Sequence, residues 1–475
     1  MKHLLYAIIA ITVAIGACST SSATKSAQKP APARNLVILY TAGARGQIRS
    51  CNCTKFRFGG YGRQLTLLKD IRTHSRDVLL LEGGDTTGEP NMQSEIKADV
   101  TVRALKMLGY AAMVPGEEEL GVRGTRYISK FEHKSVPLLC ANLFKEGGDK
   151  PKYAPYRVLK TSSGVKVGVI GLLGEQIGGP LMAKNSAETV KNALTTLRSA
   201  VKAVRPKSDV VVVLYHGTPD EARNLAGVKG VDLILSTHRA GELLFPEKGA
   251  NKVVAPITRQ GGVVMVSCET NANWSMGRID LSLGKNRKID TAAHSLLYLD
   301  RAYDEDPAMT RVYDDYNDRV KLSVLTASAK FKREGETMLA KRGLDLVEMR
   351  KRLRKSPLAA SAKCKDCHAE IHESWSNTRH AHAMATLEKS RQQFDPECVS
   401  CHATGVNVRN GYINQDETPE LANVGCEACH SPGAAHAAVP AKGYGAAGEQ
   451  TCRSCHTDER TPDFDFDAAW AKIKH

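Results

Sequence analysis

Short apolar segments alternate with amphipathic segments along residues 35–300. Seven segments rich in Val, Ile and Leu have the length and composition of buried strands: 36–40, 78–82, 111–114, 165–171, 210–215, 231–235 and 263–268. Residues 63–74, 94–108 and 188–204 instead carry apolar side chains at helical spacing. Because strands that alternate with helices build layered α/β structures, the pattern predicts an α/β domain over residues 35–299.

The pattern changes after residue 300. Residues 300–356 are highly charged with helical periodicity, which predicts one or two connecting helices before Pro357. In the 119 residues from 357 to 475, only 12 are Ile, Leu, Val or Met and 7 are Phe, Tyr or Trp. Chains this poor in apolar residues do not offset the entropy that folding costs, so the region needs apolar surface from another source.

The same region carries four Cys-x-x-Cys-His motifs. They are Cys364-Lys-Asp-Cys367-His368, Cys398-Val-Ser-Cys401-His402, Cys426-Glu-Ala-Cys429-His430 and Cys452-Arg-Ser-Cys455-His456. Two thiols at this spacing form thioethers with the two vinyl groups of one haem, and the following histidine binds the iron. A structural zinc site would leave that histidine unexplained. The motifs therefore predict four covalent haems that form the core of a domain over residues 357–475, rather than a disordered tail.

Five further histidines lie among or after these motifs: His372, His380, His382, His436 and His475. Five candidates for four distal positions favour mostly bis-histidine haems of low potential. The motifs span 93 residues, from Cys364 to His456. So short a segment cannot insulate four porphyrins from each other, which predicts electron transfer between neighbouring haems.

The contexts of these residues resemble the multihaem cytochrome c-554 family over about 110 residues. The similar segments are Trp375-Ser-Asn-Thr-Arg-His380-Ala-His382-Ala, Cys401-His402-Ala-Thr-Gly405, Gly425 to His436, and the ending Phe464 to His475. The resemblance implies that His380, His436 and His475 are distal ligands and that His382 is the fourth. His372 is the weakest candidate, because the family more often has an aromatic residue there.

The ends of the predicted strands resemble another family, the calcineurin-like metallophosphoesterases of the 5′-nucleotidase type. The similar segments are Leu39 to Gln47, Gly84-Asp85, Gly116 to Leu120, Ala141-Asn142-Leu143, Tyr215-His216-Gly217 and Ser236 to Ala240. The resemblance implies a metallophosphoesterase-like α/β sandwich in which Asp, His, Asn and His ligands at strand ends hold two metals. Two metals can clamp a phosphate ester and activate a water.

Several ligand positions of that family are altered here. Gly43, Arg45 and Ala240 stand where the first Asp, the first His and the last His are expected, and Glu117 and Glu118 stand in place of Asn-His. Asp85, His216 and His238 remain as a residual metal pocket. We therefore expect the fold without the phosphatase activity, although Glu117, Glu118 and the cysteines leave a different metal site open.

Four cysteines after the leader lie outside the haem motifs: Cys51, Cys53, Cys140 and Cys268. In an oxidising compartment they predict one or two disulfides. A metal or redox site built from Cys51 and Cys53 is the alternative. The sequence does not decide the pairing.

The first residues predict export. Lys2 and His3 precede an apolar run from Leu4 to Ile15, followed by Gly16-Ala17-Cys18. This order is typical of a signal peptide over residues 1–17, and the run is too short to span a bilayer. Ile15 to Cys18 resembles a bacterial lipobox with Cys18 as the lipidated residue, the alternative being an ordinary signal peptide. Residues 18–34 then form a flexible tether. The resemblance implies a cell-envelope lipoprotein of the outer membrane, on its periplasmic or extracellular face.

The formal net charge of +15 does not indicate a nucleic-acid partner. The Lys and Arg residues are scattered, and about eight haem propionates would cancel roughly half of the excess. We expect redox partner proteins instead, such as other cytochromes or quinol-linked complexes, with the membrane contacted through the lipid anchor. Self-assembly of the chain is left open.

These observations together predict an exported, lipid-anchored tetrahaem electron carrier with an inactive metallophosphoesterase-like domain. Two alternatives remain from the sequence. One is an active phosphatase or 5′-nucleotidase fused to a cytochrome, and the other is a multihaem reductase of small nitrogen or sulfur oxyanions, which needs an open iron position.

Overall fold

The computed structural model describes residues 34–50, 58–122, 126–132, 136–184, 187–238, 250–268, 273–342, 356–457, 460–461 and 463–475. Several sequence predictions lie outside these residues. They are the signal peptide, the lipidated Cys18, the tether up to residue 33, Cys51, Cys53, Ala240 and the end of the predicted connector, residues 343–355. No helix in the described part of the chain is both long enough and apolar enough to cross a membrane.

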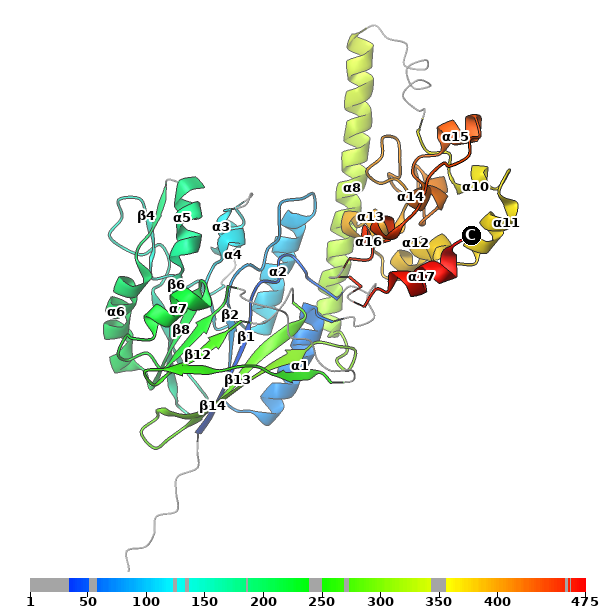
Figure 1. Ribbon diagram of the computed structural model, residues 1–475. Helices are drawn as coiled ribbons and strands as arrows, with labels where there is room; N and C mark the ends of the chain where they lie inside the picture. The colour runs from blue at the N-terminus through cyan, green and yellow to red at the C-terminus, as the bar shows by residue number, and fades with distance from the viewer. Residues whose placement is uncertain are drawn as a thin grey trace, which may run out of the picture.

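Two six-stranded sheets form the centre of the N-terminal region (Figure 1). The first sheet has the strand order β10-β14-β13-β1-β2-β3: Lys252–Val254, Ile289–Tyr298, Ser275–Leu283, Arg34–Thr41, Val78–Glu82 and Ala112–Met113. The second has the order β11-β12-β9-β8-β6-β5: Thr258–Gln260, Val263–Ser267, Leu233–Ser236, Val210–His216, Lys166–Leu173 and Tyr156–Lys160. A small pair, β4 (Leu143–Lys145) and β7 (Glu188–Val190), lies apart from them.

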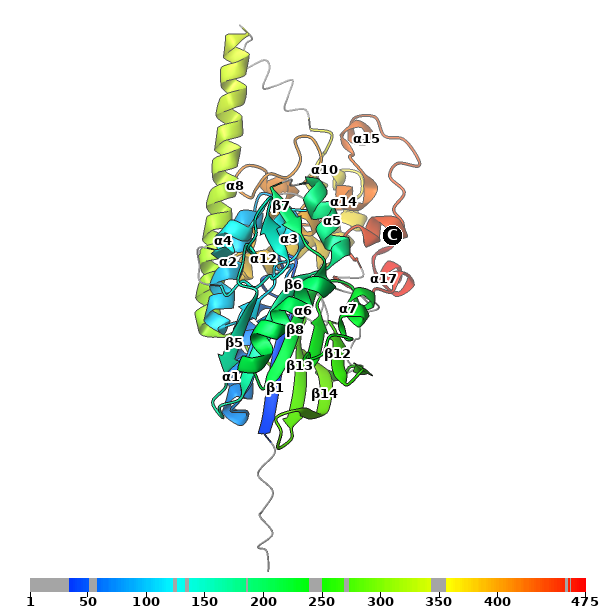
Figure 2. The ribbon, with the colours of Figure 1, turned by 90° about the vertical axis from the view of Figure 1, so that its left-hand side faces the viewer.

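The alternation of side chains along β8 explains the layers of this region. Val210, Val212 and Leu214 belong to the large core that the two sheets share, whereas Val211 and Val213 pack in a second core with helix α6. Side chains of a strand alternate between its two faces, so a strand covered on both faces is apolar throughout. Figure 2 shows α6 (Ala193–Val204) and α7 (Pro219–Leu225) over the second sheet.

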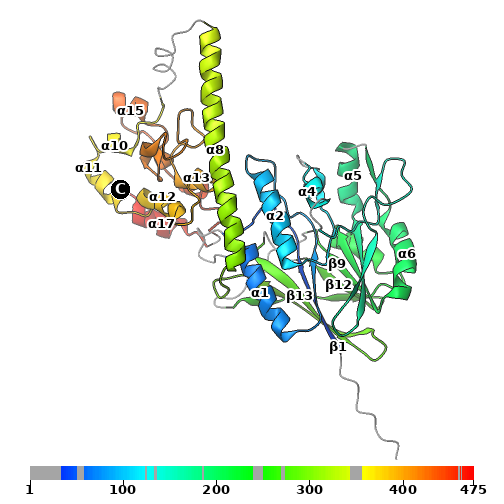
Figure 3. The same cartoon turned by 180° about the vertical axis from the view of Figure 1, so that it is seen from behind.

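The first sheet is covered by α1 (Tyr61–His74), α2 (Ser94–Leu108) and the start of α8 (Pro307–Lys341), as Figure 3 shows. Met309, Tyr313, Tyr316 and Val320 of α8 are buried in the same core as the sheets. The predicted connector is therefore in part a structural element of the N-terminal region. The short helices α3 (Glu117–Leu120), α4 (Ile128–Glu132) and α5 (Glu175–Lys184) and the 3-10 helix η1 (Arg205–Lys207) complete it.

Each of the seven predicted strands is present, with ends shifted by up to two residues. The helix predicted over residues 188–204 is only partly correct. Glu188–Val190 form β7, which pairs with β4, and the helix begins at Ala193 after the side chain of Asn192 caps it through the backbone NH of Thr195. The long hairpin of β13 and β14 was not predicted, because its alternating buried and half-buried positions lack a continuous apolar run.

The C-terminal region consists of short helices joined by irregular segments. Its elements are α10 (Ser361–Cys364), α11 (Ala369–Ser376), η2 (His380–His382), α12 (Ala383–Lys389), α13 (Pro396–His402), η3 (Pro419–Leu421), α14 (Cys426–His430), α15 (Ala434–Ala438), α16 (Glu449–Arg453) and α17 (Phe466–Ile473). Helices α10, α11, α15, α16 and α17 bury no residue against protein. Seven buried side chains around Leu358 and Met384 make the one apolar core cluster of this region within the described chain.

Helix α8 lies between the two regions (Figures 1 and 3). The hydroxyl of Tyr316 donates to Asp395 over 3.0 Å, and Arg391 pairs with Asp314 and Asp318 of the same helix. Lys97 of α2 reaches Glu397 at 2.6 Å. The segment 391–397, which leads into the second Cys-x-x-Cys-His motif, is therefore fixed against the N-terminal region.

Candidate functional site

The topology gathers polar residues at one edge of the N-terminal region. Strands β2 and β3 are parallel neighbours in the first sheet, and β8 and β9 are parallel neighbours in the second. Asp85 follows β2, Glu117 follows β3, His216 ends β8 and His238 follows β9. Because the carboxyl ends of parallel strands meet at the same edge, four segments that are distant in sequence place their side chains together.

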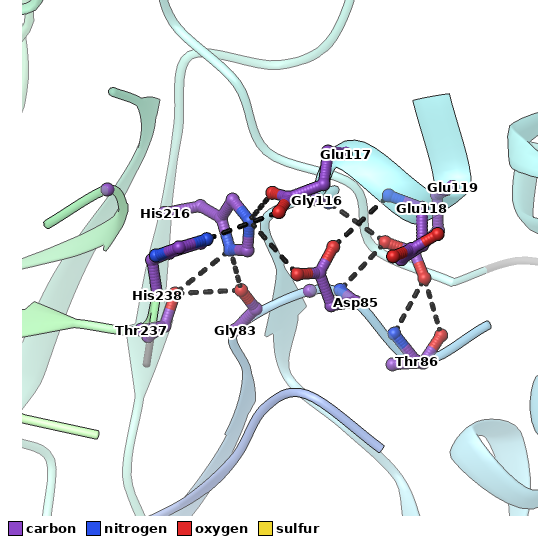
Figure 4. A network of polar contacts seen from close by, with 12 residues as sticks. Gly83, Asp85, Thr86, Gly116, Glu117, Glu118, Glu119, His216, Thr237 and His238 are labelled. Carbon is purple, nitrogen blue, oxygen red and sulfur yellow. Dashed lines mark hydrogen bonds and ion pairs between the residues drawn. The ribbon is translucent and has the colours of Figure 1, made fainter. Parts of the chain in front are cut away.

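These four side chains are in contact, as Figure 4 shows. One oxygen of Glu117 lies 2.8 Å from Nε2 of His216, and its other oxygen lies 3.2 Å from Nε2 of His238. The carboxylate of Asp85 lies 3.7 Å from Nε2 of His216. Asp85, Glu117 and His216 are each at most 5% exposed, and His238 is half-buried. The predicted residual pocket of Asp85, His216 and His238 is thus assembled, with Glu117 at its centre.

A second carboxylate fixes the loop that carries Asp85. Asp85 has φ +56°, a left-handed conformation that is uncommon for a residue other than glycine. The side chain of Glu119 accepts hydrogen bonds from the backbone NH groups of Asp85, Thr86, Thr87 and Gly116 at 2.7–3.0 Å. Such backbone strain persists where the surroundings hold it in place. A side chain at Gly116 would also collide with Asp85.

The electrostatics of this cluster follow from its burial. The pKa of Asp85 is raised to about 6, chiefly by burial; His216 opposes this shift, and Glu117 and Glu119 add to it. Burial would lower the pKa of His216, but Asp85 and Glu117 raise it to about 9. Burial would raise the pKa of Glu117, yet its hydrogen bonds to His216 and His238 hold that pKa well below its ordinary value. The two carboxylates therefore favour the protonated form of His216 over its neutral form.

Other positions of the predicted metal site do not join this cluster. Gly43 offers no side chain, and the side chain of Arg45 is exposed. Asn142 is fully buried, and its amide bonds to the backbone of Leu173 and Lys191. It stabilises the neighbouring loops and does not reach the pocket. Sequence reasoning missed the role of Glu119, although Gly116-Glu-Glu-Glu119 has the spacing of a capping box, which the structure forms.

In the C-terminal region, three pairs of histidines face each other. The ring centres are 6.4 Å apart for His368 and His436, 6.3 Å for His380 and His456, and 5.6 Å for His430 and His475. An imidazole nitrogen lies about 2 Å from a bound transition metal and about 1 Å from its own ring centre, so two imidazoles on one ion have ring centres about 6 Å apart. Each pair joins a motif histidine to a predicted distal histidine, so these residues fit an iron between them.

Hydrogen bonds to the other ring nitrogen orient several of these rings. Nδ1 of His402 lies 2.8 Å from the carbonyl of Ala383, and Nδ1 of His430 lies 2.6 Å from the carbonyl of Gly445. Nδ1 of His475 lies 3.1 Å from the carbonyl of Ile473. Metal-bound histidines commonly donate their second NH to a carbonyl in this way, which leaves Nε2 for the metal.

The remaining histidines are placed differently. His382 is exposed, and its Nε2 lies 2.9 Å from the carbonyl of Ser376. His372 contacts the ring of Trp375 at 5.2 Å. No ring contact within residues 356–457 places a histidine opposite His402. These contacts do not support His382 as a fourth distal ligand, which stays a prediction from the resemblance.

The attachment cysteines of different motifs are neighbours in space. Burial and the adjacent Cys426 thiol raise the pKa of Cys364 to about 11, which connects the first and third motifs. A hydrogen bond to Cys455 lowers the pKa of Cys401 to about 5, which connects the second and fourth. Burial and then Cys452 raise the pKa of Cys429, which connects the third and fourth. The motifs are therefore ordered in space as first, third, fourth and second. None of the eight motif cysteines forms a disulfide.

Cys140 is a buried free thiol, and burial raises its pKa to about 12. It therefore does not form the disulfide with Cys268 that the sequence left open. A buried thiol with a raised pKa is a poor nucleophile, so Cys140 is a packing residue.

Comparisons with known proteins match the two regions to different families. Residues 363–431 match the family model of cytochrome c554 and c-prime. The C-terminal region is 36% identical over 93 residues to cytochrome c-554 of Nitrosomonas europaea, an alignment that covers 16% of this chain and 40% of that protein. The C-terminal region is thus a cytochrome c554 domain, and covalently bound haem c is the cofactor of this domain.

The N-terminal region resembles phosphoesterases in sequence and in fold. An apyrase of Tabanus yao is 27% identical over 274 residues, which cover 54% of this chain and 48% of the apyrase. The structure of a 5′-nucleotidase precursor from Thermus thermophilus superimposes with a TM-score of 0.51 at 19% identity, covering 60% of this chain and 59% of that one. The region therefore has an α/β metallophosphoesterase-like fold. The chain spans about half of the length of these two relatives.

Proposed function

We propose that this chain is an exported electron carrier in which four covalently bound haems form a continuous path. The observation that carries the proposal is the set of three facing histidine pairs with ring centres 5.6–6.4 Å apart. Histidine on both sides of an iron leaves no position for a substrate and gives low potentials. Three of the four haems are then suited to electron transfer alone.

The order of the attachment sites supports a path through the domain. Neighbouring thiols connect the first motif to the third, the third to the fourth and the fourth to the second. The second motif follows directly after Asp395 and Glu397, which contact α8 and α2. We infer that electrons leave or enter the path near this contact with the N-terminal region.

The N-terminal region does not hydrolyse phosphate esters under this proposal. Its family uses two metals to clamp the ester and to generate the nucleophile. Here Gly43 and Arg45 supply no ligand for one of the two ions, while Asp85, His216 and His238 remain at the other. The region would then serve as a platform that carries the cytochrome domain, held at the bacterial outer membrane through Cys18, with other redox proteins as partners.

The proposal is tested on the full-length protein from a host that matures c-type cytochromes. The intact mass should exceed that of the processed polypeptide by four haem masses, and electron paramagnetic resonance should show mainly low-spin haem. Nucleotides and simple phosphate esters should not be hydrolysed with added Mn²⁺ or Zn²⁺. Two haem masses or fewer, or phosphate release that Asp85→Ala abolishes, would contradict it.

One observation favours a second candidate function. His402 has no histidine opposite it among residues 356–457. A haem at the second motif with one open side would bind small ligands and permit reduction of a nitrogen or sulfur oxyanion. Carbon monoxide should then bind to one haem of the four, and turnover of nitrite, hydroxylamine or sulfite would favour the reductase.

A further inference from the structure

We propose that the pocket of Asp85, Glu117, His216 and His238 binds one divalent first-row transition metal ion, where the phosphoesterase fold ordinarily binds two. The proposal goes beyond the electron-transfer function and does not depend on it. Ligand atoms of Asp85, Glu117 and His238 all lie within 4.8 Å of one another. His216 adjoins them, with Nε2 at 2.8 Å from Glu117 and 3.7 Å from Asp85.

The pocket holds its ligands before an ion arrives. Nδ1 of His216 lies 2.7 Å from the carbonyl of Gly83, which directs Nε2 into the pocket (Figure 4). The backbone NH of Glu118 donates to one oxygen of Asp85 at 3.2 Å and leaves the other oxygen facing His216. Nδ1 of His238 is buried without a hydrogen-bond partner among the described residues. The contacts of His216 with Gly83 and of Asp85 with Glu118 therefore fix two of the ligands, and ligands fixed by outer contacts bind a metal more tightly.

The charge of the pocket also favours a cation. Asp85, Glu117, Glu118 and Glu119 are all at most 5% exposed and lie within one loop and one helical turn. The negative charge of Glu119 is stabilised by the hydrogen bonds that its carboxylate accepts from four backbone NH groups. Asp85 and Glu117 direct their carboxylates at the imidazoles of His216 and His238. A divalent ion bound among these groups would be the largest local charge, and neighbouring carboxylates favour it.

The position of Glu117 makes this site different from that of the phosphoesterases. A carboxylate that lies between two imidazoles replaces a neutral amide ligand, so the four donors are two nitrogens and two carboxylates. Imidazole with carboxylate suits Zn²⁺, Mn²⁺ or Fe²⁺ better than Mg²⁺ or Ca²⁺, which prefer oxygen ligands alone. Gly43 and the exposed Arg45 provide no ligand for a neighbouring ion, which limits the stoichiometry to one.

The experiment measures metal in the full-length holoprotein. Covalent haem stays in place during dialysis against a chelator, so Zn²⁺ can be added back and counted by elemental analysis, separately from haem iron. We expect one tightly bound Zn²⁺ per chain, and substitution of Co²⁺ should give visible d–d bands that reveal nitrogen ligands. Binding of two ions per chain or of none would overturn the proposal, whatever the haem content proves to be.

The variants identify the ligands. Glu117→Gln should weaken Zn²⁺ binding by at least about tenfold, since loss even of outer contacts costs that much. Glu95→Gln is the matched control, because the side chain of Glu95 is 71% exposed and lies on α2 away from the pocket. If Glu117→Gln does not fold, the Co²⁺ spectrum and the number of ions bound by the wild-type protein still test whether the pocket binds one metal ion. Unchanged affinity in a folded Glu117→Gln protein would contradict the assignment.

Discussion

The two regions of this protein obtain their cores in opposite ways. In the N-terminal region, strands such as β8 are buried on both faces, and the side chains of two sheets and of α1, α2 and α8 fill a single large core. In the described part of the C-terminal region, five of the helices bury no residue and one small cluster is apolar. The first region folds on its own side chains, whereas the second needs the covalent cofactor to supply apolar surface.

The two regions also differ in the sign of their net charge. Residues 1–356 contain 55 Lys and Arg against 35 Asp and Glu, whereas residues 357–475 contain 11 against 16. The net charge of +15 is therefore the sum of a basic N-terminal region and an acidic C-terminal region. Haem propionates would make the C-terminal region more negative. Ion pairs of both senses join the two regions: Lys97 of α2 pairs with Glu397, and Arg391 pairs with Asp314 and Asp318 of α8.

The largest effect is expected from removing one haem. The double variant Cys426→Ala/Cys429→Ala cannot form thioethers at the third motif, which adjoins the first and fourth. We expect the mass to fall by at least one haem and residues 357–475 to become sensitive to protease, while the N-terminal region stays protected. Cys140→Ala, outside the motifs, should keep the full haem content. A protected C-terminal region in the double variant would show that haem is not its core.

A core substitution in the N-terminal region should give the converse result. Leu214 in β8 is fully buried between the sheets. Leu214→Ala should reduce the free energy of unfolding of this region by about 2–5 kcal/mol, because a buried leucine leaves a cavity. Thermal unfolding followed by circular dichroism would measure the loss, and the haem spectrum should stay unchanged until that region unfolds. A matching loss of haem absorbance at room temperature would mean that the two regions share one core.

A smaller change is expected at single histidines. His475→Met should change the axial ligands of one haem from two histidines to histidine and methionine, because the rings of His475 and His430 have centres 5.6 Å apart. The potential of that haem should rise, since methionine ligation raises it. His382→Ala should leave the low-spin signal and all potentials as they are, since His382 is exposed and contacts Ser376. Electron paramagnetic resonance with redox titration distinguishes the two variants. A spectral change in His382→Ala would support the prediction that His382 is the fourth distal ligand.

The smallest effect concerns the contact between the regions. Lys97 is only 11% exposed, but its partner Glu397 is 43% exposed, so water screens the pair. A double-mutant cycle of Lys97→Ala and Glu397→Gln should give a coupling free energy below about 1 kcal/mol. The exposed pair of Lys330 and Glu334 in α8 is the control, with an expected coupling close to zero. A much larger coupling would mean that this ion pair determines how the regions dock.

Some properties of the site could be read from the sequence because they depend on local spacing. Haem attachment needs two thiols and a histidine within five residues, and the match to the cytochrome c554 family confirms the cofactor. The seven central strands were also predictable, because a strand buried on both faces is apolar without interruption. By contrast, β13 and β14 carry polar residues on one face, and this pattern was not distinguished from surface loops.

Only the tertiary structure decided which residues meet. The three histidine pairs join positions 45–76 residues apart, and no local pattern states that His380 faces His456 rather than His368. Likewise, the sequence showed Glu117 as a lost ligand, whereas the parallel strands β2, β3, β8 and β9 place it between two histidines. Residue types and spacing determine what chemistry a segment can perform. The contacts between segments arise from packing, and packing depends on the whole chain.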